Sequence, residues 1–310
     1  MHPLFGTASS VLSLGIGGGG DVVGALAVAD LARAAGLGAR VGGVTWERRP
    51  IDPLPGPRRL DELVGAEPVN DAVALAGPDT SGPGGFSFAE AHMARFLGEQ
   101  TVLVDPHSGP RTLAAHLDAA ADSLGCDLIA LVDVGGDVLA HGNEPGLASP
   151  LCDSLLLAAA AHLRHPSVCV LFGTACDGEL TADEVLERVA EVSAAGGLIG
   201  AHGLTPAELT RLEGAVAMVP TEASAMALRG GRGEYGRAEI RGGRRTVPLS
   251  PLGSILFFLD PGAAIGSAAR LARAVADCDS LEAAESRLAG MGIRTELAYE
   301  HEMAAAAATG

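Results

Sequence analysis

Short, largely apolar segments alternate with longer amphipathic segments along this chain, and that alternation limits the folds open to it. Segments 11–16, 101–104 and 127–132 are apolar at nearly every position instead of at every second one. Strands of this kind are buried on both faces, which is typical of a parallel sheet covered by helices on each side. We therefore predict a doubly wound, mostly parallel α/β sheet.

The expected elements fill a single Rossmann-like three-layer α/β sandwich over residues 1–302. We expect strands at 11–16, 39–45, 73–75, 101–104, 127–132, 167–172, 198–201 and 255–259, and helices at 21–35, 88–97, 111–124, 151–163, 181–195, 205–218 and within 262–290. The Arg- and Gly-rich segment 229–245 is expected to form a hairpin or a mobile flap, and residues 303–310 a disordered tail. In such a fold, ligands bind outside the carboxyl ends of the strands.

Composition removes several classes of function. All 21 basic residues are Arg, so a PLP Schiff base, a lysine-dependent aldolase and a Walker-A site are excluded, because each needs a lysine amine. No haem is expected. The net charge of −17 argues against nucleic acid and anionic membranes as partners. With no apolar run long enough for a bilayer, no signal peptide and five cysteines without a CxxC pair, the expected location is the cytoplasm.

A glycine-rich loop lies between the first expected strand and helix. Gly17, Gly18, Gly19 and Gly20 precede Asp21, and their amides can face an anion at the start of the helix. Asp21 is also a suitable residue to cap that helix. The GxGxxG spacing is met, but no acidic residue ends the second strand before Glu47, which argues against NAD.

The second motif follows the second expected strand. Trp46, Glu47, Arg48 and Arg49 stand together, so an aromatic face and two guanidinium groups adjoin a carboxylate. Arg binds carboxylate or phosphate through a planar pair of donors, and Trp can stack on a base or a sugar. The alternative is a surface network of Arg and Glu around a buried Trp.

The third motif follows the strand at 127–132 and is the most informative. Asp133, Asp137, His141 and Glu144 lie among glycines, which allow the chain to turn and bring carboxylates to one point. Such a cluster can bind Mg²⁺ or Ca²⁺, with Asp133 and Asp137 as ligands, or can hold a sugar through its hydroxyls. Crowded carboxylates can instead form an acid–base pair, because one pKa is raised.

Other polar residues follow further strands or lie nearby. The candidate catalytic residues are Asp133, Asp137, His141 and Glu144; the candidate ligand-binding residues are Gly17, Gly18, Gly19, Gly20, Asp21, Trp46, Glu47, Arg48, Arg49, His107, Asn143, Asp177 and Glu222.

These motifs resemble a family of archaeal and actinobacterial proteins catalogued only as a domain of unknown function. The resemblance covers about residues 10–260 and rests on GGGGDV, TWERRPIDP and DVGGDVLAHGNEPG; it implies no activity. GGGGDVVGAL also resembles a nucleotide-binding turn of phosphofructokinases, although a second GGDGS-type turn is missing. DVGGD resembles the Ca²⁺- and ribose-binding loop of nucleoside hydrolases, although the paired aspartates at its end are missing.

Taken together, the residues favour an enzyme of the hydrolase or lyase type. Its expected substrate is a small anionic or polyhydroxylated molecule, such as a nucleoside, a nucleotide or a sugar phosphate, acted on by clustered carboxylates. A non-catalytic nucleotide- or metabolite-binding protein or sensor is the alternative, and a structural partner protein is a third. Association with further copies of the chain is also open.

Overall fold

The computed structural model describes residues 2–309, which contain one nine-stranded sheet and a separate two-stranded hairpin. The order in the sheet is β3 (Val64–Pro68), β4 (Val73–Ser81), β5 (Thr101–Val104), β2 (Gly38–Val44), β1 (Ser10–Gly15), β6 (Leu128–Val134), β7 (Ser167–Phe172), β11 (Ile255–Leu259) and β8 (Leu198–Gly203). The hairpin pairs β9 (Gly236–Ile240) with β10 (Arg245–Leu249).

The five central strands are parallel, as the apolar segments predicted. β5, β2, β1, β6 and β7 run in one direction, and β3, β4 and β11 provide the antiparallel pairings toward the two edges. The sheet is therefore mostly parallel but mixed. This arrangement confirms the predicted α/β class and is consistent with a single Rossmann-like domain.

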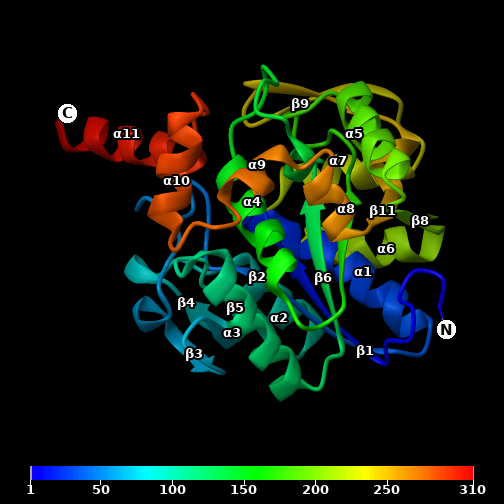
Figure 1. Ribbon diagram of the computed structural model, residues 1–310, viewed down its shortest axis with the longest axis horizontal. Helices are drawn as coiled ribbons and strands as arrows, with labels where there is room; N and C mark the ends of the chain where they lie inside the picture. Colours follow the sequence, from blue (N-terminus) through cyan, green and yellow to red (C-terminus); the bar gives the residue numbers. More distant parts are fainter. Residues whose placement is uncertain (1, 310) are drawn as a thin grey trace.

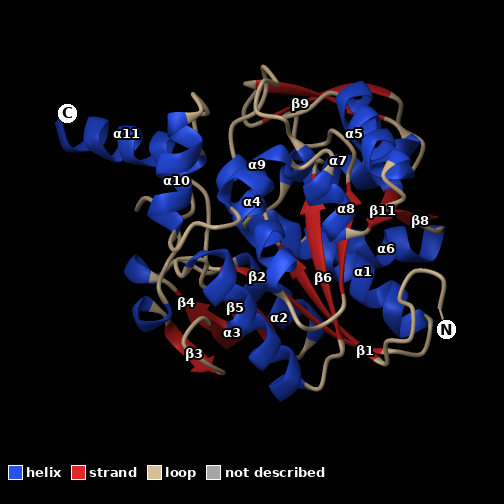
Figure 2. Cartoon of the chain, in the orientation of Figure 1, coloured by secondary structure: helices blue, strands red, loops and turns tan. Residues whose placement is uncertain are grey.

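Helices cover both faces of the sheet, as Figures 1 and 2 show. The apolar residues of α1 (Val22–Ala34), α2 (Ala89–Leu97), α6 (Pro206–Val216) and α7 (Glu222–Gly231) belong to the core on one face. Those of α3 (Gly109–Leu124), α4 (Pro150–Ala159), α5 (Ala182–Ala194), α8 (Pro261–Gly266), α9 (Arg270–Val275) and α10 (Leu281–Gly290) belong to the core on the other face.

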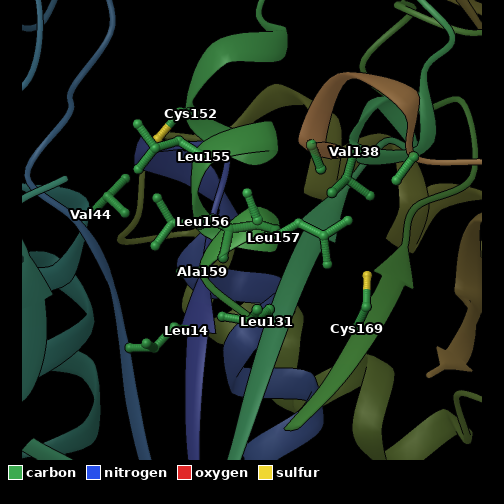
Figure 3. Packing of buried hydrophobic residues seen from close by; sticks show 14 of the residues in the cluster. Leu14, Val44, Leu131, Val138, Cys152, Leu155, Leu156, Leu157, Ala159 and Cys169 are labelled. Carbon is green, nitrogen blue, oxygen red and sulfur yellow. The ribbon is translucent and has the colours of Figure 1, made fainter. Parts of the chain in front are cut away.

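Successive residues of the central strands point into different cores, which is why these strands are apolar throughout. In β6, Leu128 and Ala130 belong to the α1 side, whereas Ile129 and Leu131 belong to the α4 side. Figure 3 shows the α4 side, where leucines of α4 lie over Leu131 and other strand residues. This packing fixes α4 across the sheet and sets the position of its first turn.

The connections leave β1 and β6 in opposite directions along the sheet. After β1 the chain crosses through α1 to β2 on one side, and after β6 it crosses through α4 to β7 on the other side. A crevice forms outside the carboxyl ends of two neighbouring strands when their connections diverge in this way. The predicted glycine loop and the Asp133 motif both begin at this point.

One segment differs from its expected structure, and a second adopts one of two expected forms. Residues 303–309, expected as a disordered tail, belong to the helix α11 (Glu296–Thr309), which extends outward in Figure 1. Segment 229–245 contains the end of α7 and most of a hairpin, which fits one of the two expected forms. Position 310 lies outside the described residues. Among residues 2–309, no helix has the length and apolar character needed to cross a bilayer.

The close approach of α1 to the sheet can be tested at Gly24. A Cβ atom there would lie 2.7 Å from Cγ2 of Val134 and 3.1 Å from Cγ1 of Val132. We expect Gly24→Ala to lower the free energy of unfolding, because overpacking by the added methyl group costs about 1–3 kcal/mol. The higher helix propensity of alanine offsets about 1 kcal/mol of this cost. Urea denaturation measures the change. Gly290→Ala, in α10 with open space around it, is the matched control and should not destabilise; equal effects would contradict the close contact.

Candidate functional site

Six carboxylates meet beyond the carboxyl ends of β1 and β6. Each of two groups offers three carboxylate oxygens that lie within 4.8 Å of one another. The first trio is Asp21, Asp133 and Asp153, and the second trio is Asp137, Asp177 and Glu179. Repulsion between the carboxylates of Asp133 and Asp137 couples the two trios. Five of the six residues are buried, and Asp21 is partly buried.

The end of β1 positions Asp21 in the first trio. The amide of Ile16 donates to the carbonyl of Val132 at 3.0 Å, which continues the β1–β6 pairing past Gly15. The next amide, that of Gly17, donates to Oδ2 of Asp21 at 2.9 Å. A Cβ atom on Gly17 would lie 2.6 Å from that oxygen and 3.0 Å from Oδ1 of Asp153. Glycine is needed here because any larger residue would enter the trio.

The expectation that the Asp21 side chain caps its helix is wrong. Asp21 occupies the residue before α1, but its side chain makes no capping hydrogen bond. The carboxylate turns back toward Gly17 instead, and this contact directs it into the acidic cluster.

The loops after β6 and β7 bring the two trios together. Gly135 donates its amide to Phe172 O at 2.9 Å and accepts from the amide of Ala175 at 2.7 Å. Gly135 has a φ of +144°, and a Cβ atom there would lie 2.4 Å from Cγ of Asp177. The close approach of these loops places Asp177 beside the Asp133 turn, where Asp133 Oδ2 accepts from the amide of Gly136 at 2.7 Å.

Sequence reasoning did not select Asp153 or Glu179 as site residues. Asp153 lies in the first turn of α4, and every residue of α4 from Pro150 to Ala159 is buried. A single acid within an otherwise apolar helix was the available signal for Asp153. Glu179 lies two residues after Asp177, but its contribution depends on the path of the loop.

Some polar atoms of the cluster have no partner. Oδ1 of Asp153, Oδ1 of Asp177 and Oγ1 of Thr174 are buried and make no hydrogen bond within residues 2–309. Glu179 differs, because it accepts from the amides of Ala148 and Ser149 at 2.7 and 2.8 Å and from Oγ of Ser149 at 2.6 Å. Buried polar atoms normally have partners, so the unpaired oxygens mark positions suited to a proton or a ligand.

Burial and mutual repulsion raise the pKa values within the cluster. Burial is the main cause for Asp21 and Asp177, whose pKa values rise to about 7 although hydrogen bonds and nearby Arg residues act in the opposite direction. Burial and then neighbouring carboxylates raise the pKa values of Asp133, Asp137 and Asp153 well above the ordinary range. Without a cation, the cluster therefore retains protons at neutral pH.

The Trp46 motif contacts the glycine loop through Arg48. Nη2 of Arg48 donates to the carbonyl of Gly17 at 2.6 Å and lies 3.3 Å from Oε1 of Glu296. Its guanidinium also lies 4.3 Å from the centre of the Trp46 ring. Trp46 is fully buried and donates to Glu300 on α11 at 3.1 Å. It is therefore the buried Trp of the alternative interpretation rather than an open stacking face.

Of the two arginines in this motif, Arg48 reaches the glycine loop and Arg49 does not. The side chain of Arg49 donates to the carbonyl of Pro53 at 2.9 Å in an exposed contact. Arg48 is surrounded by Gly17, Glu296 and Glu300. A shared anion site of both arginines with the loop amides is not formed in this arrangement.

A further acidic pair lies under the glycine loop. Glu47 accepts from the amide of Ala89 at 2.5 Å, and burial raises its pKa to about 7. A Cβ atom on Gly19 would lie 3.1 Å from Oε2 of Glu47. Glu90, which sequence reasoning missed, is fully buried, and neither carboxylate oxygen has a hydrogen-bond partner in the described part of the chain.

His141 and Glu144 form contacts of their own outside the two trios. Nε2 of His141 lies 3.1 Å from Glu191 on α5. Glu144 accepts from the amides of His141, Gly142 and Asn143 at 2.8, 2.8 and 3.0 Å. Burial opposes its charge, but these bonds and Arg188 outweigh burial and lower its pKa. Glu144 is thus suited to hold its loop as a carboxylate rather than to donate a proton.

The remaining candidates lie around the edge. Asn143 is exposed. Nδ1 of His107 lies 2.5 Å from Oδ1 of Asp105 at the end of β5. Glu222 accepts from the amide of Arg241 at 2.8 Å and so contacts the hairpin.

The acidic cluster is covered rather than open. A surface hollow of about 730 Å³ is lined by residues 3–8, 122, 127–128, 164–168 and 199. These residues include the start of β6 and of β7, so the hollow lies at the amino edge of the sheet. Asp133 and Asp137 are not among these residues.

Comparison with protein families gives one match. A family model described as "Protein of unknown function (DUF1152)" matches residues 12–304. Neither the curated proteins nor the solved structures contain a match.

The raised pKa values predict how the metal-free protein responds to pH. Asp21 and Asp177 have folded-state pKa values of about 7 against a reference value of 3.8, so the folded state binds more protons between these values. Their contribution to stability is present below about pH 4 and is lost as the pH rises through 7. We expect the Tm in EDTA to fall between pH 5 and pH 8; a loss of about 2 kcal/mol corresponds to about 3 °C in a chain of this length.

The double variant Asp21→Asn/Asp177→Asn isolates this effect from that of other titrating groups. Its Tm should fall less than that of the wild type over the same pH range, because the two side chains no longer ionise. Differential scanning calorimetry in EDTA measures both slopes. Identical slopes would contradict the assignment.

Proposed function

The chain belongs to the DUF1152 family of proteins of unknown function, and we propose that it is a divalent-cation-dependent enzyme of the hydrolase or lyase type. Its substrate is a small phosphorylated or polyhydroxylated metabolite. The observation that carries this proposal is the pair of carboxylate trios at the divergence of β1 and β6.

The charge of the cluster supports a bound cation. Carboxylates buried this closely must retain protons or be neutralised by positive charge, since an unpaired buried charge is costly. Both trios offer oxygen ligands alone, without His or Cys. Such a set favours Mg²⁺, Mn²⁺ or Ca²⁺ over zinc.

The first trio is the better primary cation site. Asp153 has an unpaired oxygen, and Asp21 accepts from the amide of Gly17. In the second trio, Glu179 already accepts three hydrogen bonds from residues 148–149. A cation in the first trio would replace protons on the aspartates without breaking hydrogen bonds such as those that Glu179 accepts.

The same residues supply the chemistry for hydrolysis or elimination. A divalent cation lowers the pKa of a bound water and stabilises negative charge that develops on oxygen. Asp177 and Glu47, with pKa values raised mainly by burial to about 7, can exchange protons near neutral pH. Asp177 is the better placed general acid or base because it belongs to the second trio and lies against Gly135.

A non-catalytic sensor for a metal-bound metabolite is the second candidate. Burial of the cluster favours the sensor, because a ligand that displaces the surrounding loops would also change the surface of the protein. The two candidates share the cation site and differ in turnover.

Cation binding is the first test. We expect isothermal titration calorimetry with Mn²⁺ to detect binding to the EDTA-treated protein. Asp153→Asn should weaken binding at least about tenfold, because one charged ligand is lost. Asp122→Asn is the control, since Asp122 is exposed and lies by the amino-edge hollow. Failure of Mn²⁺, Mg²⁺ and Ca²⁺ to bind the wild type would overturn the proposed site.

Turnover is the second test. Nucleosides, nucleotides and sugar phosphates incubated with Mg²⁺ should include at least one that the protein converts, as measured by released phosphate or by chromatography. Asp133→Asn should reduce kcat by at least about 100-fold while far-UV circular dichroism and cooperative unfolding are retained. A substrate that binds and raises Tm without conversion would favour the sensor instead.

A further inference from the structure

The β9–β10 hairpin brings two arginines to the second trio. It forms its own two-stranded sheet, apart from the nine-stranded one. In Figure 1, the arrowhead of β6 points toward the side of the molecule on which the hairpin lies. Nη1 of Arg245 lies 3.7 Å from Oε1 of Glu179, and Nη2 of Arg241 lies 3.9 Å from the same oxygen.

Neither guanidinium is well satisfied by these contacts. Arg245 donates to the carbonyls of Asp177 and Gly146 at 3.4 and 3.1 Å. Arg241 makes no side-chain hydrogen bond to any residue in the range 2–309, and its side chain is 41% exposed. Most donors of both groups are therefore available to a ligand that lies between the hairpin and the trio.

Backbone strain points to the same place. Within the described residues, Ala175 and Arg241 are the two non-glycine residues with positive φ, at 61° and 53°. Ala175 lies in the loop that carries Asp177, and Arg241 lies at the turn of the hairpin. Strained backbone is retained where function or surrounding contacts require it. Here the amide of Arg241 donates to Glu222 at 2.8 Å, which holds the turn against the start of α7.

We propose that Arg241 and Arg245 bind the phosphoryl group of the substrate above the acidic cluster. The inference rests on the proposed function and narrows it to a phosphorylated metabolite. A divalent cation in the first trio and the two guanidinium groups would balance four of the six carboxylate charges, and retained protons would neutralise the others. A phosphoryl group can then use its oxygens to bridge a cation and both arginines, which present paired donors to it.

Direct binding of inorganic phosphate and Mn²⁺ tests this inference. Calorimetry should detect phosphate binding to the Mn²⁺-loaded wild type. Arg241→Ala/Arg245→Ala should weaken phosphate binding at least about tenfold while Mn²⁺ affinity stays within about twofold of the wild type. Arg237→Ala is the matched control, because Arg237 is an exposed arginine on the same hairpin; it should leave both affinities unchanged.

The single variant Arg241→Ala guards against loss of structure in the double variant. Its side chain makes no hydrogen bond to the described residues, so the fold should be retained while phosphate binding weakens. The inference is overturned if Mn²⁺ binds but phosphate does not, or if phosphate binds the double variant as tightly as the wild type. Absence of Mn²⁺ binding is a different result, since it would remove the proposed cation site itself.

Discussion

Repulsion among the buried carboxylates at the carboxyl ends of the parallel strands determines how the candidate site is protonated and how it would bind cations. Asp133, Asp137, Asp153 and Asp177 are each less than about a tenth exposed, and each belongs to one of the two carboxylate trios. Such a cluster is tolerated when protons or cations remove its charge, so its protonation and its affinity for cations are linked. The unpaired oxygens of Asp153 and Asp177 are the atoms at which a cation would most directly replace a proton.

The fold supplies the geometry that makes this crowding possible. Parallel strands β1, β6 and β7 end at one edge, and the loops that follow are joined by backbone hydrogen bonds such as that between Gly135 and Ala175. α4 lies across the same edge and contributes Asp153 from its first turn. The hairpin adds positive charge from outside the sheet. The site thus draws on segments that are distant in sequence but meet through strand order.

Most of the sheet and part of the cluster could be predicted from the sequence. Asp21, Asp133, Asp137 and Asp177 follow apolar segments, and the ends of parallel strands share an edge. Asp153, Arg241 and Arg245 could not be placed, because their positions depend on how α4 and the hairpin pack. The Ala-rich end of the chain gave no tertiary signal, yet Glu296 and Glu300 at the start of α11 contact Arg48 and Trp46. The local sequence pattern determines the helices and strands, whereas contacts between distant segments depend on the assembled fold.

Proton release on cation binding tests the central claim most directly. Mn²⁺ titrated calorimetrically at pH 7 in buffers of different ionisation enthalpy gives the number of protons lost per cation bound. If protonated carboxylates of the first trio become ligands, at least a sizeable fraction of a proton should be released, and the number should fall in Asp153→Asn. Binding of Mn²⁺ without proton release, or release unchanged in that variant, would contradict a cation site built from these buried acids.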